Sequence, residues 1–89
     1  MQNKANELER RLREAVEGEV RFDQLSRILY STDASMYQIE PVGVLLPKSR
    51  ADTIAAIQIA RDMDVAVIPR GGGTGLAGQT VGKALIIDF

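Results

Sequence analysis

The chain has 89 residues, a formal net charge of −1, and 26% charged against 45% hydrophobic residues, the balance of a small globular domain or part of one. It contains no cysteine and no histidine, so disulfides, thiolate chemistry, zinc sites and histidine general bases are excluded within it. Near-neutral charge and few aromatic residues do not suit nucleic-acid binding, so no nucleic-acid partner is expected.

The sequence contains no recognisable targeting signal. No apolar run approaches the ~20 residues of a transmembrane helix, and the N-terminus leads into a charged helix rather than a signal peptide. These features favour a cytoplasmic protein, with peripheral attachment to a membrane left open. The chain stops at Phe89 directly after an apolar run, which we interpret as the mark of a fragment of a longer chain.

Residues 1–40 are expected to form an N-terminal helical segment. A helix is predicted over about residues 4–17, where apolar residues recur every fourth position at Leu8, Leu12 and Val16. Gly18 suits the end of this helix, and Asp23 suits the N-cap of a short second helix.

Residues 41–89 follow a strand–helix–strand rhythm that predicts the α/β class. Apolar runs at 42–46, 65–68 and 85–88 indicate three strands of one small parallel sheet, a βαβ unit plus a third strand. Ser49 followed by Asp52 predicts the capped start of a helix that continues to about Met63. Its apolar face is expected to contain Ile54, Ile57, Ile59, Ala60 and Met63.

The most informative segment is residues 71–82, which hold six of the eight glycines. Glycine lets the main chain approach a ligand closely, and successive N–H groups then form a concave anion site. The alternative is a flexible glycine linker. Because the segment lies between two predicted buried strands, the loop is better interpreted as a cradle for a pyrophosphate.

Two familiar phosphate motifs do not explain this loop. Residues 73–78 match G-x-G-x-x-G, but the dinucleotide fingerprint also needs a helix that opens at its last glycine. Too few residues separate Gly78 from the next strand for such a helix. A P-loop ending at Lys83 would need glycine at Ala77 and Ser or Thr at Ala84.

Residues 68–79, Ile-Pro-Arg-Gly-Gly-Gly-Thr-Gly-Leu-Ala-Gly-Gln, resemble the pyrophosphate loop of FAD-linked oxidases of the vanillyl-alcohol-oxidase superfamily, whose FAD-binding domain is of the PCMH type. The glycolate oxidase subunit and D-lactate dehydrogenase branch is the most similar. Segments 30–37 and 41–47 also fit that branch, so the resemblance covers about residues 25–89.

The resemblance implies that the chain is the N-terminal part of a first FAD-binding subdomain, with residues 41–89 as its first half. The residues implied to bind the cofactor are Pro69, Arg70, Gly71, Gly72, Gly73, Thr74, Gly75, Leu76, Gly78 and Gln79. Two roles stay open for Arg70: charge supplied to the pyrophosphate, or a surface cation. Asp33, Ser35 and Tyr37 either line the cofactor edge or satisfy their own backbone.

The implied cofactor is non-covalent FAD, because the chain has no His or Cys and carries Thr74 where relatives with covalent flavin can have histidine. No catalytic residue and no metal site is expected within the chain. The small-molecule substrate would bind to the remainder of the protein, and the electron acceptor is not indicated.

The resemblance implies an oxidoreductase of a small 2-hydroxy acid of the D-lactate or glycolate type. Two alternatives remain: the same fold acting on another substrate, as in alcohol or aldehyde oxidases and a reductase of cell-wall sugar precursors, or a non-catalytic nucleotide-binding module. The isolated chain is expected to fold marginally, to be inactive, to bind FAD weakly and to self-associate through exposed strand edges.

Overall fold

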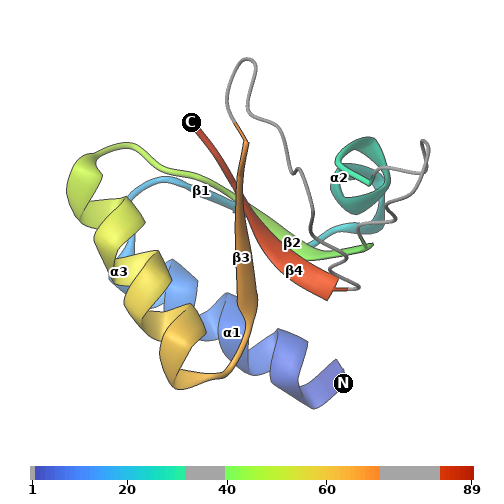
Figure 1. Cartoon of the computed structure of the whole chain (residues 1–89), viewed down its shortest axis with the longest axis horizontal. Helices are drawn as coiled ribbons and strands as arrows, with labels where there is room; N and C mark the ends of the chain where they lie inside the picture. The colour runs from blue at the N-terminus through green and yellow to red at the C-terminus, as the bar shows by residue number, and fades with distance from the viewer. Residues whose placement is uncertain (1, 32–39, 71–82) are drawn as a thin grey trace.

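The computed structural model describes residues 2–31, 40–70 and 83–89, which form three helices and four strands (Figure 1). In chain order these are α1 (Gln2–Ala15), β1 (Glu19–Arg21), α2 (Gln24–Leu29), β2 (Glu40–Leu46), α3 (Arg50–Asp62), β3 (Ala66–Arg70) and β4 (Lys83–Asp88). None of the described helices is long and apolar enough to cross a membrane.

The strands form one sheet in the order β1-β2-β4-β3. β2 and β3 both pair with β4 in parallel, so the three strands expected from the apolar runs are confirmed, with β4 between the other two. The sheet is mixed rather than parallel, because β1 pairs antiparallel with β2. The sequence did not indicate β1, whose three residues include one apolar side chain, the buried Val20.

β3 continues through Pro69 to Arg70, two residues beyond the predicted strand end. Proline has no N–H to donate, so it is tolerated where a strand has a neighbour on one side alone. Among the described strands, β3 lies at the edge of the sheet and pairs with β4 alone, which explains why Pro69 does not end it.

Both faces of the sheet are covered, as Figure 1 shows with α1 and α3 on one side and α2 on the other. Leu85 and Ile87 of β4 belong to the larger apolar cluster, together with Leu8 and Leu12 of α1. The alternate β4 residues, Ala84 and Ile86, belong to a second cluster on the opposite face, together with Val44 of β2 and Ile68 of β3. Tyr30 packs against this second cluster. Four consecutive residues of β4 are therefore buried, as a strand covered on both faces requires.

The buried stripe of α3 differs from the expected one. Ile54 and Ile57, expected on the apolar face, are 49% and 42% exposed. The buried residues are Asp52, Ala56 and Ala60, spaced four apart on one side of the helix. The small side chains of Ala56 and Ala60 face the core, and Ile59 and Met63, also expected on the apolar face, pack partly buried against it.

Asp52 explains this rotation. Ser49 caps α3 as predicted, since its hydroxyl oxygen accepts a hydrogen bond from the Asp52 N–H at 3.3 Å. The Asp52 carboxylate accepts from the backbone N–H groups of Glu17, Gly18 and Lys48 at 3.0, 2.8 and 2.9 Å. This buried carboxylate thus joins the turn after α1 to the turn before α3. The side of α3 that carries Asp52 must therefore face inward.

Gly18 is required at this junction by the close approach of another backbone segment. A Cβ atom built on Gly18 would lie 2.2 Å from the Leu46 carbonyl oxygen and 2.8 Å from the Lys48 nitrogen. Because both are main-chain atoms, no side-chain rotation could relieve the overlap. The glycine that we predicted as a helix stop is therefore also a packing requirement.

We expect Gly18→Ala to destabilise the chain by about 1–3 kcal/mol, the usual cost of forcing atoms into a packed site. The measurement is urea unfolding followed by circular dichroism. Glu17→Ala, at the neighbouring exposed position, is the control and should change stability by less than about 0.5 kcal/mol. Equal unfolding midpoints for Gly18→Ala and wild type would contradict the close approach.

The second prediction concerns acid. The N–H group of Glu17, followed by that of Lys48, holds the pKa of Asp52 below its ordinary value of 3.8. A depressed folded-state pKa contributes stability above that ordinary value, and the contribution is lost as pH falls through the lower folded pKa. Asp52→Asn should therefore be less stable than wild type at pH 7, and the difference should shrink towards about pH 2.

The control for the acid experiment is Asp62→Asn, an exposed position in the same helix. At pH 7 it should unfold in urea at the wild-type midpoint, because its side chain is exposed. A stability gap between wild type and Asp52→Asn that stays constant from pH 7 to pH 2 would refute the assignment of the charge to this junction.

Candidate functional site

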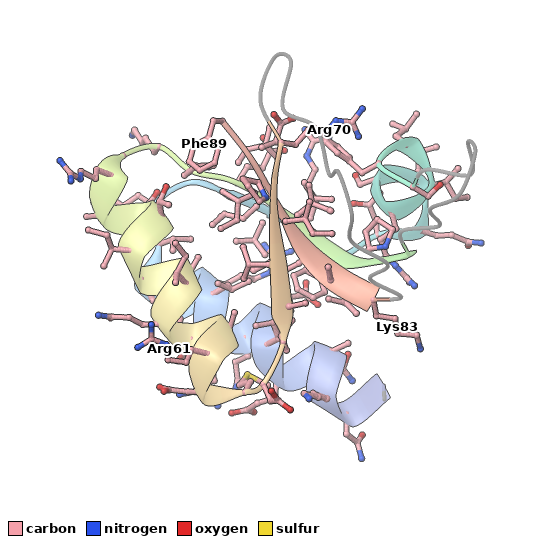
Figure 2. All side chains as sticks on the ribbon, in the orientation of Figure 1. Arg61, Arg70, Lys83 and Phe89 are labelled. Carbon is pink, nitrogen blue, oxygen red and sulfur yellow. The ribbon has the colours of Figure 1, made fainter. Side chains whose placement is uncertain are left out.

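The carboxyl ends of β2, β3 and β4 lie at one edge of the sheet, where ligands of open α/β sheets usually bind. β3 ends there with Arg70, directly before the glycine-rich segment. The segment is followed in sequence by Lys83, the first residue of β4, which lies at the opposite end of the strands from Arg70, as the labelled side chains in Figure 2 show.

Most of the residues expected to bind the cofactor lie outside the described part of the chain. These are Gly71, Gly72, Gly73, Thr74, Gly75, Leu76, Gly78 and Gln79, and the same is true of Asp33, Ser35 and Tyr37. Pro69 and Arg70 are described, and both are exposed at the end of β3.

The backbone of Arg70 is held by the neighbouring strand. Arg70 and Asp88 are register partners in the parallel pair of β3 and β4. The N–H group of Phe89 donates a hydrogen bond to the Arg70 carbonyl oxygen at 3.0 Å. The position from which the glycine-rich segment departs is therefore fixed by the sheet.

The guanidinium of Arg70 lies over the ring of Tyr30, with 5.1 Å between its central carbon and the ring centroid. This distance is within the range of a cation–π interaction. Among residues 2–31, 40–70 and 83–89, the Arg70 side chain has neither an ion-pair partner nor a hydrogen-bond acceptor. No group in the described ranges thus competes with an anion for its N–H donors.

The hydroxyl group of Tyr30 donates a hydrogen bond to the Asp88 carboxylate. This bond, with burial of the phenol as a second cause, raises the pKa of Tyr30 above its ordinary value of 10.0. Sequence reasoning missed Tyr30 as a site residue. The signal was its place in segment 30–37, which contributed to the family resemblance.

Tyr30 is positioned by the short helix α2. Asp23 caps α2 by accepting from the Ser26 N–H at 2.9 Å, and Tyr30 follows the last helical residue as the C-cap. Arg27 also ties α2 to the sheet, since its Nε donates to the Pro41 carbonyl oxygen at 3.0 Å. The Tyr30 ring therefore extends from the end of a capped helix that Arg27 ties to β2.

The described donor set suits a pyrophosphate rather than a reaction. A guanidinium with unpaired donors is a preferred partner of phosphate oxygens. The phenol and the carboxylate beside it are bonded to each other. The described part of this edge thus offers a group that can bind a phosphate and, among the described residues, no free acid–base pair.

Three comparisons with known proteins identify the family and the fold of this chain. A family model described as the FAD binding domain matches residues 41–89. D-2-hydroxyglutarate dehydrogenase of Haemophilus influenzae is 35% identical over 76 residues, which cover 82% of this chain and 7% of that protein. The Escherichia coli K12 enzyme of the same name is 36% identical over 75 residues, which cover 81% of this chain and 7% of that protein.

The chain thus spans only about 7% of the length of these curated relatives. Among solved structures, wild-type BBE-like 1 of Physcomitrella patens superimposes with a TM-score of 0.69 at 20% identity, and a variant of it with 0.69 at 21%. Each match covers 91% of this chain and 18% of the other, and it establishes the shared fold.

The family model covers more than half of the chain, and the resemblance inferred from residues 68–79 is confirmed. This chain belongs to the FAD binding domain family.

Proposed function

We propose that this chain anchors the pyrophosphate of FAD as part of a flavin-dependent oxidoreductase that oxidises a small 2-hydroxy acid. The observation that carries the proposal is the glycine-rich segment, which follows directly on Arg70 at the carboxyl edge of the sheet. Membership of the FAD binding domain family supports the cofactor, and the free donors of Arg70 support its pyrophosphate as the bound group.

The residues that would hold the cofactor are Pro69, Arg70, Gly71, Gly72, Gly73, Thr74, Gly75, Leu76, Gly78 and Gln79. The glycines would offer backbone N–H groups, Thr74 a hydroxyl donor and Arg70 a positive charge. The stacking of Arg70 on Tyr30 favours this role over that of an unconstrained surface cation. When bound, the isoalloxazine supplies the redox chemistry, and the protein supplies position and electrostatics.

The names of the relatives support the proposed substrate class. They are named for D-2-hydroxyglutarate, a 2-hydroxy acid like the D-lactate and glycolate expected from the sequence resemblance. We therefore propose D-2-hydroxyglutarate as the first substrate to test in the full-length protein. The domain division at residue 40 and a cytoplasmic location are part of the same proposal.

The full-length protein should be purified with a flavin absorption spectrum that D-2-hydroxyglutarate, D-lactate or glycolate bleaches under anaerobic conditions. The L-enantiomer of 2-hydroxyglutarate is the control and should leave the flavin oxidised. Bleaching by a simple alcohol or by NADPH alone would indicate another substrate, and a colourless protein would indicate a nucleotide-binding module.

Acid precipitation should release the flavin into the supernatant, because the proposed attachment is non-covalent.

Gly73→Val should abolish flavin retention by the full-length protein, because a β-branched side chain restricts the backbone and fills the anion cradle. The measurement is the ratio of flavin to protein absorbance. Ala66→Val adds bulk at an exposed position of β3 and should retain flavin at the wild-type ratio. Full flavin content in Gly73→Val would refute the cradle.

A further inference from the structure

Two opposite charges at the site edge are neighbours without forming an ion pair. Arg70 and Asp88 are register partners at the ends of β3 and β4. Oppositely charged side chains on neighbouring strands attract each other, and arginine with a carboxylate readily forms a bidentate pair. In the described structure, both side chains instead engage Tyr30, the carboxylate its hydroxyl and the guanidinium its ring.

We propose that Tyr30 is a positioning residue that keeps the Arg70 guanidinium available to the FAD pyrophosphate by occupying the Asp88 carboxylate. This inference rests on the proposed function. The Tyr30 ring presents the guanidinium without consuming its N–H donors, because a cation–π contact uses the face of the ring and no lone pair. The hydroxyl gives Asp88 a partner other than Arg70.

Tyr30 can perform this separation because the core holds its ring in place. The ring packs against the apolar cluster of Val44, Ile68, Ala84 and Ile86, and the Tyr30 N–H donates to the Ser26 carbonyl oxygen at 3.2 Å. An ion pair of Arg70 with Asp88 would occupy several of the five guanidinium donors, and it would neutralise the charge that attracts the phosphate.

A purely structural role for Tyr30 predicts different results. In that case the Tyr30–Asp88 hydrogen bond would matter only as a link between α2 and β4, and removing either partner would weaken the fold. In the positioning role, loss of the Tyr30 hydroxyl frees the Asp88 carboxylate to pair with Arg70, which weakens FAD binding. Removing the charge of Asp88 as well should therefore restore FAD binding. A double-variant cycle separates the two roles.

The experiment is the titration of FAD into the full-length apoprotein, followed by flavin fluorescence. Tyr30→Phe keeps the ring and frees Asp88, so FAD should bind about tenfold more weakly, the order expected when a charged hydrogen bond is lost. The double variant Tyr30→Phe with Asp88→Asn should bind within about threefold of wild type. Asp88→Asn alone should bind FAD as tightly as wild type or more tightly.

Arg70→Ala provides the matched control. It should weaken FAD binding, and Tyr30→Phe should then add no further loss, because the group that Tyr30 positions is absent. Thermal unfolding of each apoprotein is measured in parallel. The apoprotein of the double variant should be no more stable than that of Tyr30→Phe, because in the positioning role its recovery of FAD binding does not come from a more stable fold.

The inference is overturned if Tyr30→Phe binds FAD like wild type, if Asp88→Asn does not restore the loss, or if Asp88→Asn alone weakens binding severalfold. The last outcome counts even if Tyr30→Phe does not fold. Wild-type apoprotein that does not bind FAD would overturn the proposed function, and this inference with it.

Discussion

The structure depends on the three hydrogen bonds that the Asp52 carboxylate accepts from backbone N–H groups. Two of these groups belong to Glu17 and Gly18, at the turn after α1, and the third belongs to Lys48, before α3. A buried carboxylate is costly unless its oxygens are satisfied, so the two turns must stay together for Asp52 to remain buried. The contact of Gly18 with the Leu46 carbonyl fixes the same junction from the other side. Helices α1 and α3 and strands β1 and β2 all begin or end here.

The junction bears on function because it lies at the carboxyl end of β2, the same edge at which β3 and β4 end. β4, buried on both faces, lies between β2 and β3 and carries Asp88 at its end. The strand that carries Arg70, β3, therefore pairs with β4, the strand that is buried on both faces. The side chain of Arg70 is itself exposed. This arrangement places the glycine-rich sequence directly after a strand that is held by its neighbour, as is common for binding loops on sheets.

The sequence was informative wherever the determinants were local. Apolar runs located three strands, and Ser49 located the start of α3, because strand burial and helix capping involve neighbouring residues. The predicted apolar face of α3 was wrong at Ile54 and Ile57, which are exposed. The rotation of the helix is set by hydrogen bonds between Asp52 and residues 34 and 35 positions away in the sequence. At the site, Arg70 and the glycines were visible as a run. Tyr30 was not, because its hydroxyl bonds Asp88, 58 positions away.

The exposure of Arg70 indicates how such an edge can be selective without binding tightly by itself. A charge-assisted hydrogen bond in water contributes little net free energy, because water competes for both partners. The same bond strengthens when other surfaces exclude water from it, since the local dielectric constant falls. The described edge positions one guanidinium over an aromatic ring, but nothing described covers its donors. The edge thus positions one positive charge, and the strength of the phosphate binding proposed for it would depend on how far other surfaces exclude water from Arg70.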